Sequence, residues 1–91
     1  MSIKIGYYVG VDKEGEKVDI RKIVGGYCRQ FREETLKTSI TDFSKTVNEN
    51  AKNISAFEHG RANNIKYLFF YSNFNNKYKE EFLTGLFNLM S

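Results

Sequence analysis

Ser39–Arg61, SITDFSKTVNENAKNISAFEHGR, predicts two short helices around a tight turn. The first is expected over Ile40–Val47, with Ser39 as its N-cap and Asp42 at the third helical position, an acidic variant of the capping box. The second is expected to begin after Asn50, because asparagine is a preferred N-cap residue. This stretch decides the fold, since the other segments are interpreted by how they would pack around it.

Two helices can cross closely around such a turn only if their contact residues allow it. Ser44 supplies the small residue on the first helix, and Asn48 supplies a residue that tolerates left-handed backbone angles in the turn. Gly60 follows as a C-terminal stop. Four apolar side chains lie at offsets that would hold the helices together: Phe43, Val47, Ile54 and Phe57. The stretch therefore predicts a helix-turn-helix.

The flanking segments predict further helices. Beginning at Arg21, apolar residues recur at spacings of three and four, and Gly25 and Gly26 mark either the start of this helix or a close helix crossing. Ile65–Phe74 is a short apolar run that fits a buried helix or a strand, and its helical surroundings favour a helix. After an asparagine-rich turn, Lys77–Met90 predicts the last helix. The first of these helices would bury Ile23, Val24, Tyr27, Cys28 and Phe31.

Residues 1–20 follow a different pattern. Apolar Ile3, Ile5, Tyr7 and Val9 alternate with other side chains, which is typical of a strand. A polar turn at 12–16 would lead to a short return strand containing Val18 and Ile20. This segment is either a hairpin or a partly ordered arm.

The predicted fold class is therefore mainly α, a helix-turn-helix domain of four to five helices with a short N-terminal β-hairpin. We expect one domain over 1–91, comprising the hairpin or arm at 1–20, the helix-turn-helix core at 21–74 and the C-terminal helix at 77–91. The single cysteine, the lack of a signal-peptide pattern and the lack of a long apolar run predict a cytoplasmic protein with no membrane span.

Charge permits nucleic-acid binding without demanding it. The net charge is +3, and the basic excess lies within residues 21–61. No phosphate loop, catalytic triad or metal-ligand spacing is present in the sequence, so it does not indicate an enzyme and implies no cofactor. The lone His59 lies at the expected helix end without the partners that a metal site needs.

The line FSKTVNENAKNISAFEHGR resembles the helix-turn-helix of the phage repressor, Cro and XRE regulator family. That family ends its second helix with isoleucine, serine, glutamate, glycine and a basic residue at fixed spacing. Ile54, Ser55, Glu58, Gly60 and Arg61 match this pattern in order, and the resemblance covers about residues 23–71. No family resemblance extends to residues 1–20.

The chain departs from the family pattern at four positions. Ser44 replaces the usual alanine and Asn48 the usual glycine, both with little change in size or backbone tolerance. Glu49 replaces an apolar residue, so its charge must reach solvent or a basic partner. Ile40 replaces a polar residue that contacts the operator backbone in the family.

The resemblance implies a sequence-specific DNA-binding transcriptional regulator of phage or mobile-element type. The second helix would enter the major groove of double-stranded DNA, with four residues facing the DNA and Lys52 donating to guanine: Ala51, Lys52, Ser55 and Ala56. Asn50 and Asn53 would either hold phosphates or read adenine. Arg29 or Arg32 would add charge, unless Arg32 pairs with Glu58 in a structural role. The implied DNA-binding residues are Ser39, Thr41, Lys45, Asn50, Ala51, Lys52, Asn53, Ser55, Ala56 and Arg61.

Two further expectations concern partners. A homodimer would form through aromatic and apolar residues of the C-terminal region, which equally well complete the core: Tyr67, Phe70, Tyr71, Phe82, Phe87 and Met90. The alternative function is a phage-type protein-binding module or inhibitor that uses the same scaffold, or the hairpin, against a host protein. The extra hairpin and the acidic Glu49 near the second helix are the features that motivate this alternative.

Overall fold

The carboxylate of Asp19 begins the helical body by capping its first helix. The computed structural model describes residues 10–11 and 17–90, in which α1 spans Ile20–Gln30. Asp19 accepts a hydrogen bond from the backbone N–H of Arg21 at 3.0 Å, the usual arrangement of an N-cap. The expectation that Ile20 lies in a return strand is therefore wrong, because this cap makes it the first, buried residue of α1.

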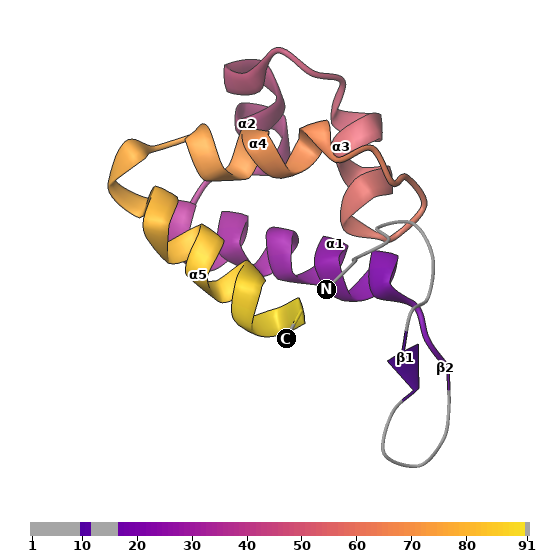
Figure 1. Cartoon of the computed structure of the whole chain (residues 1–91). Coiled ribbons are helices and arrows are strands. Elements are labelled where there is room, and N and C mark those ends of the chain that lie inside the picture. The colour runs from indigo at the N-terminus through magenta and orange to yellow at the C-terminus, as the bar shows by residue number, and fades with distance from the viewer. Residues whose placement is uncertain (1–9, 12–16, 91) are drawn as a thin grey trace.

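In the part of the chain that the structure describes, five α-helices pack into a compact globule (Figure 1). Helix α1 continues into the π-helix η1 (Phe31–Leu36), and α2 (Ile40–Val47) and α3 (Ala51–Glu58) follow. The chain then forms α4 (Lys66–Asn73), the single 3₁₀ turn η2 (Asn76–Tyr78) and α5 (Lys79–Met90). Helix α1 packs against both α3 and α5, while α5 folds back along α4. Nowhere in the described part of the chain is a helix long and apolar enough to cross a bilayer.

The N-terminal hairpin falls only partly on described residues. Two-residue strands, β1 (Gly10–Val11) and β2 (Lys17–Val18), pair antiparallel with Gly10 opposite Val18. The predicted first strand, at residues 3–9, and the predicted turn at 12–16 lie outside the described residues.

The structure confirms the helix caps and the turn that were predicted within residues 39–61. The hydroxyl of Ser39 accepts a hydrogen bond from the N–H of Asp42 at 3.1 Å, and the side chain of Asn50 accepts one from the N–H of Lys52 at 2.7 Å. Asn48 has φ 58° and ψ 51°, the left-handed conformation expected of the turn, and Gly60 has φ 78°. Helices α2 and α3 are therefore bounded where the cap and turn residues predict.

The helices at the C-terminal end enclose much of the aromatic core. Ile65–Phe74 is helical, as favoured, but α5 begins at Lys79 rather than Lys77, since Asn75 caps the 3₁₀ turn first. The ring of Tyr71 stacks on Phe43 with centroids 4.6 Å apart and lies 6.0 Å from Phe82. Tyr67, Tyr71 and Phe82 are almost fully buried. These three predicted dimer contacts therefore belong to the core instead.

Gly25 allows α1 to approach α3 closely. A Cβ built at this position would lie 2.7 Å from the carbonyl oxygen of Glu58 and closer still to that of Phe57. At Gly26, one residue further along the same helix, an added Cβ would meet no atom within 4 Å. The glycine pair therefore marks a helix crossing and not the start of α1, and only Gly25 is required by it.

Replacing these glycines with alanine should have opposite effects on stability. Gly25→Ala should lower the free energy of unfolding by about 1–3 kcal/mol, because the methyl group meets rigid backbone. Gly26→Ala should raise it by about 0.5–1 kcal/mol, because alanine has the higher helix propensity. Urea denaturation monitored by circular dichroism measures both, and a loss at Gly26 equal to that at Gly25 would contradict the crossing.

Candidate nucleic-acid interface

Helix α3 has one buried face and one accessible face. Ile54, Phe57 and Glu58 point into the molecule, which confirms the predicted buried pair. Of the four residues implied to face the DNA, Lys52 is exposed and the other three are half-buried: Ala51, Ser55 and Ala56. Asn53, implied to hold a phosphate or read adenine, is exposed. None of these residues is among the buried residues of α3.

The residues implied as backbone contacts lie on either side of α3 in the chain. Thr41 and Lys45 are exposed on α2, and Arg61 is exposed immediately after α3. The N-cap residues Ser39 and Asn50 are exposed as well. The Ser39 hydroxyl is already occupied by the N–H of Asp42, so only its remaining lone pair and its proton are available to a ligand.

This surface carries three exposed cations. Among the described residues, Lys45, Lys52 and Arg61 form no ion pair. Exposed cations that form no ion pair remain available to an anionic ligand. These three are therefore the strongest charge-bearing candidates at the interface.

Glu49, the acidic departure from the family pattern, is held by neighbouring groups. Its carboxylate accepts hydrogen bonds from the N–H of Asn50 at 2.8 Å and from Asn53 Nδ2 at 3.3 Å, and it lies 3.4 Å from Lys66 Nζ. The Asn50 N–H, followed by the other contacts, lowers the pKa of Glu49. The expected basic partner is thus Lys66, and the Asn53 amide implied in base reading is engaged with Glu49.

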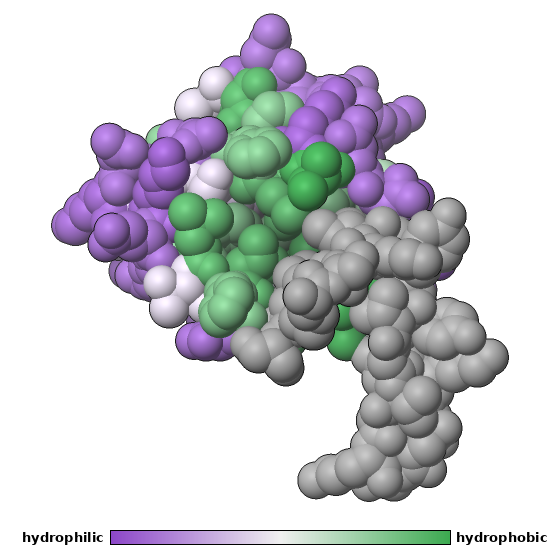
Figure 2. Space-filling view, viewed as in Figure 1, coloured by the Kyte–Doolittle hydropathy of each residue, from purple (hydrophilic) through white to green (hydrophobic). Residues whose placement is uncertain are grey.

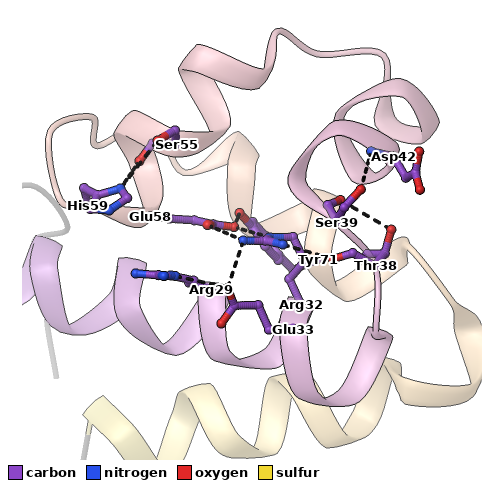
Figure 3. Close-up of polar contacts among 10 residues, drawn as sticks. All are labelled: Arg29, Arg32, Glu33, Thr38, Ser39, Asp42, Ser55, Glu58, His59 and Tyr71. Carbon is purple, nitrogen blue, oxygen red and sulfur yellow. Dashed lines mark hydrogen bonds and ion pairs between the residues drawn. The ribbon is translucent and has the colours of Figure 1, made fainter.

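A buried ion pair fixes the inner face of α3 (Figure 3). Arg32 donates from Nε and Nη2 to the two carboxylate oxygens of Glu58, at 2.8 and 3.0 Å. The Tyr71 hydroxyl donates to the same carboxylate at 2.7 Å, and Arg32 Nη1 donates to the carbonyl oxygen of Thr38 at 2.9 Å. Arg32, Glu58 and Tyr71 are only 5, 4 and 1% exposed, so the structural pairing expected for Glu58 is confirmed.

The arginines considered as extra DNA contacts have other partners. Arg32 is buried by its pairing with Glu58, which raises its pKa, and it cannot reach a phosphate. Arg29 is exposed but lies 3.3 Å from Glu33, one turn along (Figure 3). The π-helix η1, which carries Arg32, was not predicted from the sequence.

His59 and Cys28 each have a structural environment in the domain. His59 Nδ1 donates to the carbonyl oxygen of Ser55 at 2.8 Å, and Cys28 is a fully buried small side chain as expected. Within residues 10–11 and 17–90, no three His, Cys, Asp or Glu side chains cluster as a metal site would require.

No protein-family model, curated protein or solved structure matches this chain. The functional assignment therefore depends on the side chains and contacts described above.

Removing Arg32 should be far more costly than removing Arg29. Arg32→Ala leaves the Glu58 carboxylate buried without its bidentate partner, and we expect a loss of about 3–5 kcal/mol in the free energy of unfolding. Arg29→Ala removes an exposed pair and should cost at most about 1 kcal/mol. Chemical denaturation of both variants measures the difference, and similar losses would show that the buried pair contributes no more than a surface one.

Stability should fall at alkaline pH because folding raises the pKa of one cysteine and two tyrosines. Burial raises the pKa of the Cys28 thiol and of the Tyr71 hydroxyl, and it raises that of Tyr27 to about 12. Above the ordinary values of about 8.5 for cysteine and 10 for tyrosine, the unfolded chain releases protons that the folded chain keeps.

Each such group should reduce the free energy of unfolding by about 1.4 kcal/mol per pH unit, from its unfolded pKa until its folded pKa is reached. Urea denaturation at intervals from pH 7 to 11 measures this slope. Cys28→Ala should remove the part of the slope that begins near pH 8.5 and leave the part that begins near pH 10. An unchanged profile in this variant would contradict the assignment to Cys28.

Proposed function

We propose that this protein is a small sequence-specific DNA-binding transcriptional regulator of phage or mobile-element type. The observation that carries the proposal is the accessible surface of α3, where Lys52 is exposed beside small side chains and forms no ion pair with a residue that the structure describes. The opposite face of the same helix is fixed by Glu58 and its buried partners. A rigid helix with a small, cationic outer face is what major-groove reading requires.

In this proposal α2 and α3 act as a helix-turn-helix, with β1 and β2 as part of an N-terminal hairpin. Helix α3 lies in the major groove with its N-terminal turn against base edges, where Lys52 donates to guanine O6 or N7. Ala51 and Ala56 contact thymine methyl groups. Lys45 and Arg61 hold phosphates on either side and set the register of the domain.

The charges of this surface support an anionic ligand. Glu49, the acidic residue nearest the start of α3, is paired with Lys66 and so opposes the ligand less than a free carboxylate would. The residual positive charge comes from Lys45, Lys52 and Arg61, each exposed. Phosphate contacts of this kind make affinity strongly dependent on salt.

A homodimer is part of the proposal, since one such domain buries a modest surface and commonly binds one half of a two-fold site. With Tyr67, Tyr71 and Phe82 in the core, the interface must use other side chains. Figure 2 shows hydrophobic surface gathered over α4 and α5. Among the described residues, five large apolar side chains are exposed there or at the helix boundary, and Phe87 is one of the dimer contacts expected from the sequence: Ile65, Phe69, Leu83, Phe87 and Leu89.

DNA binding is tested on a duplex selected from a randomised pool. We expect binding that weakens steeply as salt rises, followed by fluorescence anisotropy. Lys52→Ala should weaken binding by about 1–3 kcal/mol and relax the preference at one base pair. Arg61→Ala should weaken all sequences alike and reduce the salt slope by about one.

Lys79→Ala on α5 is the matched control, since it removes an exposed lysine remote in sequence from α2 and α3. This variant should bind DNA as the wild type does. Wild-type protein that selects no duplex, and binds none at about 50 mM salt, would contradict the proposal.

A protein-binding module is the second candidate, and a specific feature favours it. Ile65 and Phe69 are 56 and 58% exposed, and Phe69 lines an apolar cavity between α2 and α4 together with Val47 and Phe70. Exposed apolar surface beside a cavity is typical of protein contacts. Binding of a host protein that Phe69→Asp abolishes and nuclease treatment does not affect would favour this function over the first.

A further inference from the structure

A second cavity lies between α1, η1 and α5, and none of its lining residues belongs to α2 or α3. Its volume is about 300 Å³. The lining comes from three segments: Tyr27 and Gln30 of α1, then Phe31, Glu34 and Thr35 of η1, with Glu81 and Gly85 of α5. This volume is at the lower end of the range for small-molecule sites, roughly 300–1,000 Å³.

The aromatic walls of this cavity are held in place. The Tyr27 hydroxyl donates to the carbonyl oxygen of Phe82 at 2.7 Å, and the Tyr27 and Phe31 rings have centroids 6.2 Å apart. Both rings also pack on the ring of Phe82. Gly85 makes room for Tyr27, since a Cβ there would lie 2.9 Å from Tyr27 Cζ. The walls are therefore preformed.

The charged groups of the lining are both acidic. Glu34 and Glu81 are exposed, and neither forms an ion pair with any described residue. Glu34 accepts only a long hydrogen bond from Gln30 Nε2, at 3.4 Å, among the contacts that the structure describes. None of the lysines and arginines in the described ranges lines the cavity.

We propose that this cavity binds a small organic cation, a guanidinium or alkylammonium compound, between the Tyr27 and Phe31 rings and the carboxylates of Glu34 and Glu81. Aromatic faces attract cations, and a planar guanidinium matches a carboxylate through paired hydrogen bonds. The site goes beyond the proposed DNA contacts, because it shares no residue with them.

The test is titration of the full chain with agmatine, which carries a guanidinium and an ammonium group. Calorimetry should give saturable one-to-one binding, and the amide NMR signals of Tyr27 and Gly85 should shift. Glu34→Gln and Glu81→Gln should each weaken binding roughly tenfold, the effect of losing a charge-assisted contact. The uncharged analogue butylurea should not bind.

Glu80→Gln is the matched control, because Glu80 is exposed beside Glu81 but does not line the cavity. It should leave the affinity for agmatine unchanged. An equal loss in Glu80→Gln would show general attraction by acidic charge and overturn the proposal, as would butylurea binding or no saturation. Binding of arginine-containing peptides without agmatine binding would also overturn it, in favour of a protein side chain.

The outcome is separable from DNA binding. Lys52→Ala should bind agmatine as the wild type does, whether or not the wild type binds DNA. Loss of agmatine binding in Lys52→Ala would contradict the assignment to this cavity.

Discussion

The buried contact between Arg32 and Glu58 is the constraint on which the arrangement of the helices depends. Two charges taken out of water are costly unless every polar atom is satisfied. Here the Arg32 guanidinium donates hydrogen bonds to both carboxylate oxygens of Glu58, and the Tyr71 hydroxyl donates a third. The carbonyl oxygen of Thr38 accepts a hydrogen bond from the remaining guanidinium nitrogen. One network thereby joins η1, α3 and α4, and the outer face of α3 has a defined direction because its inner face is fixed.

The fold could be predicted from the sequence where its causes are local. Ser39, Asn48 and Asn50 act on backbone groups within three residues, so the bounds of α2 and α3 follow from residue type. The π-helix could not be predicted this way, because it carries Arg32 to a carboxylate 26 residues away in the sequence. The division of aromatic residues between core and surface likewise depends on how α4 and α5 pack.

At the candidate interface too, the sequence shows the residue types, whereas their partners depend on the fold. The sequence identifies which side chains of α2 and α3 are cationic or small, but not which of them are already bound. Asn53 is engaged by Glu49, and Glu49 by Lys66, a residue beyond the matched motif. Fewer side chains are available to an anionic ligand than the resemblance implies. Those with a positive charge and no ion pair to a described residue are Lys45, Lys52 and Arg61.

The π-helix gives one short segment two roles on different sides. Arg32 points inward and donates hydrogen bonds to Glu58. Phe31, Glu34 and Thr35 line the acidic cavity against α5. π-Helical turns are uncommon and often occur at functional sites, since the wider turn redirects side chains. Because Arg32 and Glu34 lie in the same wide turn, the geometry of the acidic cavity and the anchoring of α3 depend on one backbone conformation.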